Sequence, residues 1–259
     1  MSRLLAVLGR GLVPPETPVL RADDPGALRG DGAFETVHVR SGQPWLIDDH
    51  LARLARSTAD LGLTMPSGLR ELAFEAAAAW PEAEGALRIV LTRGGAAYVT
   101  VAPVPDKSKL ARRTGVSIMT MPLPDLPFPR AKILSYAGNL AALKTAAAAG
   151  HDDALWISAE GYAVEAPTAN LLWLAGGTLH TTGDSAPLLA GTTSAFVLAN
   201  SRFAAATGHA TVDDLRASDG VWLTSALRGL VAVTAIDGQP LEPSAATAEL
   251  QHLAGYPLP

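Results

Sequence analysis

The stretch that decides the fold covers residues 130–170 and reads RAKILSYAGNLAALKTAAAAGHDDALWISAEGYAVEAPTAN. Its alanine- and leucine-rich part over residues 136–149 predicts a helix. Gly150 follows, and glycine is the residue type that ends helices with a positive φ. Lys132 comes just before this helix and after a proline-rich segment. Reactive groups are often positioned at such boundaries between elements, so Lys132 is the first candidate functional residue.

The second half of the stretch predicts two short strands joined by a tight turn. Residues 153–158 are mostly apolar, Glu160-Gly161 is typical of a hairpin turn, and residues 162–165 predict the returning strand. That strand carries a carboxylate, Glu165.

Lysine is rare in this chain, which narrows the search for a reactive amine. There are 4 lysines beside 16 arginines. Lys107 and Lys109 belong to the polar sequence PDKSK, which predicts a loop, and Lys144 lies within the predicted helix. Lys132 alone lies at an element boundary, where a neutral amine could act as a nucleophile.

Composition excludes several classes of protein. The chain has 259 residues, 48% of them hydrophobic, so it can bury the core of one large or two modest domains. A net charge of −5 argues against nucleic-acid binding, which needs clustered Lys and Arg. Without cysteine there are no disulfides or thiolate sites, and the six histidines lack metal-binding spacing, so we expect no metal. GxSxG and the Gly-Lys-Ser/Thr of an ATP loop are also absent.

The sequence also predicts where the protein works. No apolar run approaches the roughly 20 residues that cross a bilayer, and the N-terminal residues lack the pattern of an export signal. We therefore expect a cytoplasmic protein that does not contact a membrane.

The clearest predicted boundary is MPLPDLPFPR at residues 121–130, whose four prolines are incompatible with a helix or a central strand. We expect an N-terminal α+β domain over residues 1–120, a linker over 121–131 and a C-terminal domain over 132–259.

In the N-terminal part, GDGAFET at residues 30–36 predicts a turn that opens a long strand. No helix follows at the spacing of a dinucleotide-binding motif. Asp48-Asp49 is expected to cap a helix over residues 50–60, which begins HLARL. Arg53 in this helix could give two parallel hydrogen bonds to a phosphate.

Two arginines belong to the apolar strand predicted over residues 85–93. Arg88 lies inside it, where a charge is costly unless paired, so a buried ion pair and an anion-binding role are equally compatible with the sequence. Arg93 at the strand end is a further candidate to bind a carboxylate. Further on, GTTS at 191–194 opens a helix predicted to end near residue 207, where backbone N–H groups and hydroxyls can hold an anion or cap the helix.

Together these motifs resemble the class IV aminotransferase family of pyridoxal-phosphate (PLP) enzymes, also called fold type IV. KILSY at 132–136 and GYAVE at 161–165 match its lysine and glutamate motifs, and GDGAFET and HLARL match its N-terminal ones. The resemblance covers about residues 30–238. It implies an α/β (α+β) fold of two domains with PLP at their interface. Members include branched-chain and D-amino acid aminotransferases and 4-amino-4-deoxychorismate lyases.

The resemblance implies cofactor-binding roles for residues in both halves of the chain. Lys132 would join the PLP aldehyde as an imine, and Glu165 would keep the pyridine nitrogen protonated so that the ring accepts electrons. Tyr136 would bond the ring hydroxyl, with a plain core tyrosine as the alternative. Arg53 would bind the phosphate.

The rest of the phosphate site is implied by GTTS and by TSALRG. Its residues would be Thr192, Thr193, Ser225 and the Ala226 amide. The chain departs from the family pattern here, because Thr192 replaces an isoleucine and Ser194 replaces an arginine; Thr193 is therefore the stronger candidate.

Substrate-binding roles follow less directly from the same resemblance. Phe34 would line the substrate pocket, or it is ordinary core. Arg88 and Arg93 are candidates for the substrate carboxylate, and Arg228 in SALRG could bind one carboxylate of a dicarboxylic substrate.

Among the subfamilies we favour 4-amino-4-deoxychorismate lyase, which releases pyruvate and forms 4-aminobenzoate for folate synthesis. The Arg-x-His pair of D-amino acid aminotransferases is missing from GGAAYVT at residues 94–100, the chain is compact, and SALRG resembles the SLRG of many lyases. The alternative is an aminotransferase acting on D- or branched-chain amino acids. A non-catalytic, phosphate-binding homologue fits less well, since Lys132, Arg53 and Glu165 are all present. We also expect a small-molecule amino substrate and a homodimer.

Overall fold

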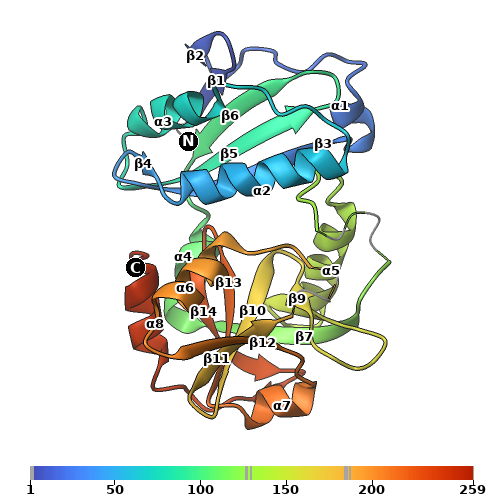
Figure 1. Ribbon diagram of the computed structural model, residues 1–259, viewed down its shortest axis with the longest axis vertical. Coiled ribbons are helices and arrows are strands. Elements are labelled where there is room, and N and C mark those ends of the chain that lie inside the picture. Colours follow the sequence, from blue (N-terminus) through green and yellow to red (C-terminus); the bar gives the residue numbers. More distant parts are fainter. Residues whose placement is uncertain (1–2, 126–127, 129, 184–185, 187, 259) are drawn as a thin grey trace. The chain divides into compact units, whose positions relative to one another are not determined.

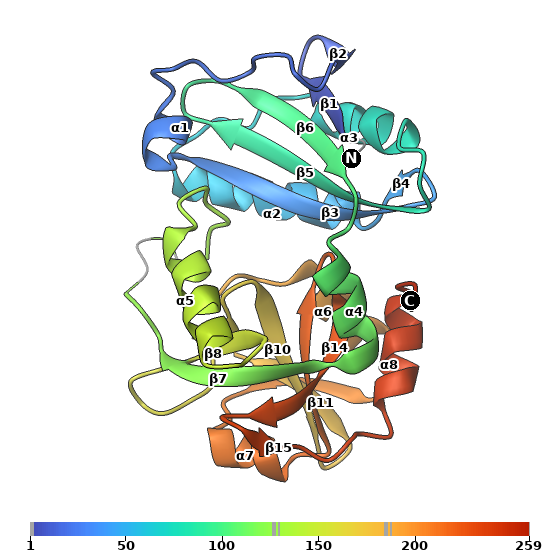
Figure 2. The ribbon, with the colours of Figure 1, turned by 180° about the vertical axis from the view of Figure 1, so that it is seen from behind.

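The computed structural model describes residues 3–125, 128, 130–183, 186 and 188–258. The chain divides into two compact units. Unit 1 comprises Met1–Pro105 with Arg130–Tyr136, and unit 2 comprises Asp106–Pro129 with Ala137–Pro259. Each unit combines helices with one main sheet, so the predicted mixed α/β class is confirmed (Figures 1 and 2).

Unit 1 is built on an antiparallel sheet of six strands in the order β2-β1-β6-β5-β3-β4. Its elements are β1 (Leu4–Val7), β2 (Gly11–Val13), α1 (Pro25–Arg29), β3 (Gly32–Arg40), β4 (Gln43–Pro44), α2 (Ile47–Asp60), α3 (Leu69–Ala78), β5 (Glu84–Thr92) and β6 (Ala97–Ala102). Helices α2 and α3 cover one face of the sheet, as both ribbon views show.

The alternation of side chains along β3 decides what each face of this sheet carries. Successive side chains of a strand point to opposite faces. Ala33, Val37 and Val39 belong to the core beneath the helices, and Glu35 is in phase with them. Phe34 is out of phase with that set, so it projects from the other face.

Unit 2 is built on a mixed sheet in the order β12-β11-β10-β13-β14-β7-β8, with β15 beside β14 and β9 beside β10. Its elements are α4 (Asp106–Thr114), β7 (Val116–Pro122), α5 (Ala137–Ala148), β8 (Asp153–Ile157), β9 (Glu165–Ala166), β10 (Ala169–Ala175), β11 (Thr178–Thr182), α6 (Thr192–Asn200), β12 (Ala204–Gly208), α7 (Val212–Ala217), β13 (Gly220–Ser225), β14 (Gly229–Ile236), β15 (Gln239–Pro240) and α8 (Thr247–Ala254).

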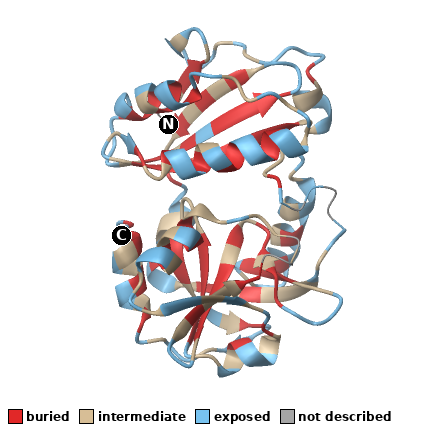
Figure 3. Cartoon of the chain, viewed as in Figure 1, coloured by how far each residue is buried: buried red, intermediate tan, exposed pale blue. Residues whose placement is uncertain are grey.

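The stretch quoted first forms a crossover within this sheet. β7 and β8 are parallel neighbours, and parallel neighbours need a long connection, which here includes α5. The helix packs its small side chains, Ala142 and Ala146, against Trp156 of β8. Figure 3 shows where the buried residues lie: they gather on the central strands, while the outer sides of the helices are exposed.

The units differ from the predicted domain boundaries at two places. Residues 130–136 belong to unit 1, because Ile133 forms a β-bridge with Ala33 and the Leu134 N–H bonds the Gly32 carbonyl. Residues 106–120 belong to unit 2, since β7 pairs with β8 and β14.

Three local expectations were wrong. The segment containing PDKSK is helix α4 rather than a loop. Helix α6 ends at Asn200, and Ala204–Gly208 is a strand paired with β11. Helix α2 begins at Ile47 with Leu46 as N-cap, so Asp48 does not cap it; its carboxylate accepts a 2.8 Å hydrogen bond from Arg70 Nε instead.

Candidate active site

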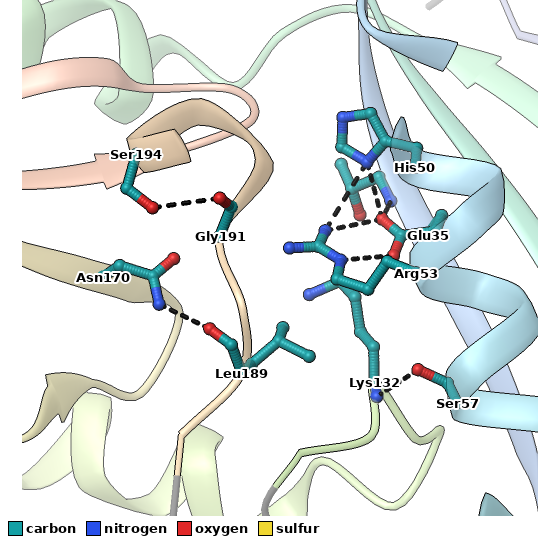
Figure 4. Close-up of polar contacts among 10 residues, drawn as sticks. Glu35, His50, Arg53, Ser57, Lys132, Asn170, Leu189, Gly191 and Ser194 are labelled. Atoms are coloured by element: carbon teal, nitrogen blue, oxygen red, sulfur yellow. Dashed lines mark hydrogen bonds and ion pairs between the residues drawn. The ribbon is translucent and has the colours of Figure 1, made fainter. Parts of the chain in front are cut away.

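The backbone of Lys132 is fixed between a strand and a helix of unit 1. Its N–H donates to Ser57 Oγ on α2 at 2.9 Å (Figure 4). Its carbonyl accepts from the Phe34 N–H of β3 at 2.9 Å. These two hydrogen bonds fix the backbone of the short segment before α5, so the side chain of Lys132 projects from a fixed position.

The Lys132 side chain lies against an aromatic pair. Its Nζ is 4.5 Å from the ring centroid of Phe34 and 5.6 Å from that of Tyr136. The two rings meet edge to face at 5.3 Å, and Phe34 is buried. The predicted residues Lys132, Phe34 and Tyr136 therefore form one cluster, although residues 34 and 132 are far apart in the sequence.

Arg88 adds a cation to this cluster. Its guanidinium carbon lies 4.6 Å from the Phe34 ring centroid, within the range of a cation–π contact. The residue is exposed, and within the described part of the chain its guanidinium makes no hydrogen bond or ion pair. Of the two roles left open by the sequence, the buried ion pair is therefore wrong, and an anion-binding role fits the geometry.

Arg53 is held by a carboxylate that projects from β3. Arg53 Nε donates to Glu35 Oε1 and Nη2 donates to Glu35 Oε2, both at 2.7 Å, and His50 Nδ1 lies 2.8 Å from Oε2 (Figure 4). Glu35 and His50 are fully buried and Arg53 is almost so. The planar guanidinium is thus locked in orientation by two parallel bonds.

The charge states of this trio follow from its surroundings. Burial alone would raise the pKa of Glu35, but the charge and hydrogen bonds of Arg53, together with His50, lower it to about 2. Burial lowers the pKa of His50, opposed by Glu35 and reinforced by the charges of Arg53 and Lys132. Because a carboxylate can only accept, neutral His50 must carry its proton on Nδ1.

Arg93 lies apart from these contacts. Its Nε donates to Asp31 Oδ2 at 2.5 Å, and its Nη2 donates to the Leu61 carbonyl just after α2 at 2.7 Å. These bonds tie the end of β5 to α2, which gives Arg93 a structural role in unit 1.

In unit 2, Glu165 lies on a tight hairpin opposite Asn170. The two residues pair across β9 and β10. Asn170 Nδ2 donates to the Leu189 carbonyl at 2.7 Å (Figure 4) and to Glu165 Oε2 at 3.1 Å. The Leu189 N–H lies 3.4 Å from Glu165 Oε1. The carboxylate is therefore held by a side chain and by the segment that leads into α6.

The N-terminus of α6 is closely packed on that segment. Gly191 is the N-cap, and a Cβ there would overlap with Asn170 Oδ1 and Ser194 Oγ. Thr192 begins the helix. Thr193 is buried, and its hydroxyl has no hydrogen-bond partner among the described residues.

Helix α6 packs on β13, whose end carries the other predicted phosphate-binding residues. Thr224 is buried, and its hydroxyl likewise lacks a partner in the described part of the chain. Ser225 pairs with Gly229 across the turn from β13 to β14, and Ala226 lies in that turn. A helix N-terminus beside unsatisfied hydroxyls is an arrangement suited to an anion.

Arg228 follows in the same turn, but its guanidinium contacts protein groups. Nη1 lies 2.5 Å from Asp153 Oδ2, and Nη2 lies 3.2 Å from Thr168 Oγ1.

Comparison with known proteins shows the family of this chain. The family model described as "Amino-transferase class IV" matches residues 32–236. The chain belongs to the class IV aminotransferase family. A relative from Mycobacterium tuberculosis named "Bifunctional aminodeoxychorismate lyase / D-amino acid transaminase" is 35% identical, with 92% of this chain and 93% of the relative covered.

Solved structures of class IV aminotransferases share the whole fold. "A hypothetical aminotransferase from Mycobacterium tuberculosis, PLP-bound form" has a TM-score of 0.91 at 34% identity, with 97% of each chain covered. The fold IV-transaminase CpuTA1 from Curtobacterium pusillum has a TM-score of 0.90 at 31% identity, with 99% of this chain and 100% of that chain covered. The predicted family and fold type are confirmed, and the protein is a PLP-dependent enzyme of this family.

The residues of each unit fit that cofactor. The hydroxyls of Thr193 and Thr224 are buried without a partner in the described chain, and phosphate oxygens would accept from them. Lys132 offers an amine against aromatic rings, and Glu165 offers a carboxylate whose position is fixed by Asn170.

Three residues of these groups were missed in the sequence. Glu35 and His50 hold Arg53, and Asn170 holds Glu165. A signal for Glu35 existed: it is in phase with the core residues Ala33 and Val37, and a carboxylate in such a position requires a cationic partner. Asn170 was visible as the position opposite Glu165 across a two-residue turn.

Two absences hold for the described residues. They contain no cluster of His, Asp or Glu that could hold a metal ion. No described helix is long and apolar enough to cross a membrane.

Proposed function

We propose that this enzyme is a 4-amino-4-deoxychorismate lyase that releases pyruvate and forms 4-aminobenzoate for folate synthesis in the cytoplasm. The observation that carries the proposal is the cation–π contact of exposed Arg88 with the Phe34 ring, which also contacts Lys132. A cation near a reactive amine suits an amino substrate that carries carboxylates.

The residues of unit 1 would divide the work as follows. Lys132 would hold the cofactor aldehyde, and its amine would serve as the base that takes the proton from the substrate carbon. Arg53, oriented by Glu35, binds the phosphate, and Tyr136 donates to the ring hydroxyl. Arg88 binds a substrate carboxylate.

The residues of unit 2 would supply further groups that bind the cofactor. Glu165 keeps a proton on the pyridine nitrogen, and bound PLP then supplies a ring that accepts electrons from the reacting carbon. Thr193, Ser225 and the Ala226 amide bind the phosphate, with Thr192 as a further hydroxyl at the start of α6.

Loss of the lysine tests this arrangement. Purified enzyme should absorb in the imine region, roughly 400–430 nm, where such cofactor–lysine linkages absorb. Lys132→Ala should lose the band and the activity, whereas Lys144→Ala, in the adjoining helix, should keep both. A band that survives in Lys132→Ala rejects the assignment.

A second candidate is an aminotransferase acting on D- or branched-chain amino acids. The observation that favours it is the name of the relative that is 35% identical, which combines a lyase with a D-amino acid transaminase. Pyruvate release from 4-amino-4-deoxychorismate should be measured beside keto-acid formation from D-alanine and from leucine. The lyase proposal predicts that pyruvate release is faster than keto-acid formation. The opposite order of rates would favour the transaminase.

Arg88→Gln sharpens the substrate assignment. It should raise KM for the preferred substrate about tenfold or more, the size expected for a lost charge-assisted hydrogen bond, with little change in PLP affinity. An unchanged KM would contradict a carboxylate-binding role for Arg88.

We also propose a homodimer, following the assembly that the family resemblance implies. Light scattering at micromolar concentration should give the mass of two chains. A monomer that is fully active would reject this part of the proposal.

A further inference from the structure

Arg228 was predicted to bind a substrate carboxylate, yet its guanidinium connects three segments of unit 2. Nη1 lies 2.5 Å from Asp153 Oδ2 at the start of β8, and Nη2 lies 3.2 Å from Thr168 Oγ1 in the turn between β9 and β10. Nε lies 3.4 Å from Ser225 Oγ at the end of β13. One side chain therefore spans the start of β8, the hairpin that carries Glu165, and the turn that carries Ser225 and Ala226.

The partner of this guanidinium is a buried carboxylate. Asp153 is 1% exposed, and the side chain of Arg228 is 13% exposed. The second oxygen of Asp153, Oδ1, accepts the Ala154 N–H at 2.8 Å. Separating such a pair would leave a buried charge uncompensated, which is strongly unfavourable, so Arg228 is committed to Asp153 rather than to an incoming ligand.

The turn that carries Arg228 is also fixed from the other side. Tyr256 Oη donates to the Ala226 carbonyl at 2.8 Å, and Arg112 Nη2 donates to the Leu227 carbonyl at 2.6 Å. Because each peptide unit is planar and trans, holding these carbonyls also holds the N–H groups of Leu227 and Arg228, which point the opposite way.

We propose that Arg228 and Asp153 are positioning residues that set the shape of the turn Ser225–Gly229 for phosphate binding. This inference rests on the proposed phosphate site at Ser225 and Ala226. It replaces the substrate-binding role of Arg228 with an indirect one, in which the guanidinium holds the turn against the hairpin of Glu165.

The test compares ligands with and without a phosphate. Dissociation constants for PLP and for pyridoxal are measured by titrating the cofactor-free enzyme, for wild type, Asp153→Asn and Arg228→Lys. Arg228→Lys keeps a charge for Asp153 but cannot reach three partners, so it carries the test if Asp153→Asn fails to fold. The control is Asp213→Asn, which removes the exposed partner of half-buried Arg216 on α7.

The proposal predicts a selective loss of phosphate recognition. The preference for PLP over pyridoxal should fall about tenfold or more in Asp153→Asn and Arg228→Lys, the size of a lost charge-assisted bond. Asp213→Asn should keep the wild-type preference. Asp153→Glu, which retains the carboxylate, should recover part of it.

Two results would overturn the inference. Equal weakening of both ligands would mean that the pair only stabilises the fold. An unchanged preference for PLP over pyridoxal with a raised KM for a dicarboxylic substrate would mean that Arg228 binds a substrate carboxylate. The preference does not depend on the reaction catalysed, so an enzyme that binds PLP but releases no pyruvate refutes the lyase proposal and leaves this inference standing.

Discussion

The two units prepare for a ligand in opposite ways. In unit 1 the candidate phosphate-binding group, Arg53, is already bonded to buried Glu35 by two 2.7 Å hydrogen bonds. In unit 2 the buried hydroxyls of Thr193 and Thr224 have no partner among the described residues.

This difference predicts which substitutions change the stability of the protein and which change its affinity for a ligand. Removing one member of a buried charge pair leaves the other charge uncompensated, so the variant should unfold more easily whether or not a ligand is bound. Unsatisfied hydroxyls destabilise the empty protein and gain partners only with the ligand. Substitutions in the Glu35–Arg53 pair should therefore act mainly on folding, and substitutions of the Thr193 or Thr224 hydroxyl mainly on binding.

The largest effect is expected from Glu35→Gln, which takes the carboxylate away from buried Arg53. It should lower the free energy of unfolding by about 3–5 kcal/mol, the range for breaking a buried ion pair, as measured by denaturant titration. Asp48→Asn is the control, because Asp48 and Arg70 form an exposed pair that should be worth less than about 1 kcal/mol. Equal losses in the two variants would contradict the account of unit 1.

The same pair should make unfolding depend on pH. The pKa of Glu35 is lowered from 4.5 to about 2, so its stabilisation is complete above pH 4.5 and is lost as the pH falls toward 2. The loss should be on the order of 3 kcal/mol. The lowered pKa of His50 has the same sign and begins to act below pH 6.5. Denaturant titrations should show that the gap between wild type and Glu35→Gln narrows in acid; a constant gap would contradict this.

A smaller effect is expected at the start of α6. Gly191→Ala should destabilise the protein by about 1–3 kcal/mol, as overpacking does, because the new Cβ overlaps with Asn170 and Ser194. Gly138→Ala in α5 is the opposite case. Among the described residues, no atom outside its chain neighbours and the helix's own backbone lies within 4 Å of its Cβ position, so it should stabilise by about 0.5–1 kcal/mol. Thermal unfolding measures whether each substitution stabilises or destabilises the protein. If both substitutions changed stability in the same direction, Gly191 would not be tightly packed.

The smallest effect on folding is expected at the buried hydroxyl of Thr224, whose loss should change PLP binding more than stability. Thr224→Val should leave the empty protein as stable or up to about 1 kcal/mol more stable, yet weaken PLP binding roughly tenfold. Thr182→Val is the matched control, since that buried hydroxyl donates to the Val164 carbonyl at 2.6 Å and its loss should destabilise. Equal destabilisation by both substitutions would mean that Thr224 does not await a ligand.

Local patterns predicted much of the fold. The helix over residues 136–149 and the strand over 153–158 were found within a residue or two, as α5 and β8. The clearest wrong prediction concerns β12. Its alanines favour a helix, and the helix was predicted to end near residue 207, but the segment pairs with β11 as a strand. Tertiary pairing overrode propensity there, as it does for edge strands.

For the candidate site, motifs indicated which residues to consider, but the sequence did not show which partner each side chain contacts. Lys132 and Phe34, which come from separate motifs, lie in one cluster. The three arginines proposed for substrate differ because of residues remote in the sequence: Arg93 pairs with Asp31 and Arg228 with Asp153, while Arg88 lies exposed over Phe34. No local pattern distinguishes these environments, since Asp31 and Asp153 lie 62 and 75 residues away from their arginines in the sequence.

The most direct test of the central claim is to fix the cofactor on its lysine. Enzyme loaded with PLP is reduced with borohydride, which makes an imine linkage permanent, and its peptides are weighed by mass spectrometry. The account predicts the added cofactor mass on the peptide that contains Lys132 and on no other lysine. Label on Lys107, Lys109 or Lys144 with an unlabelled Lys132 would contradict it.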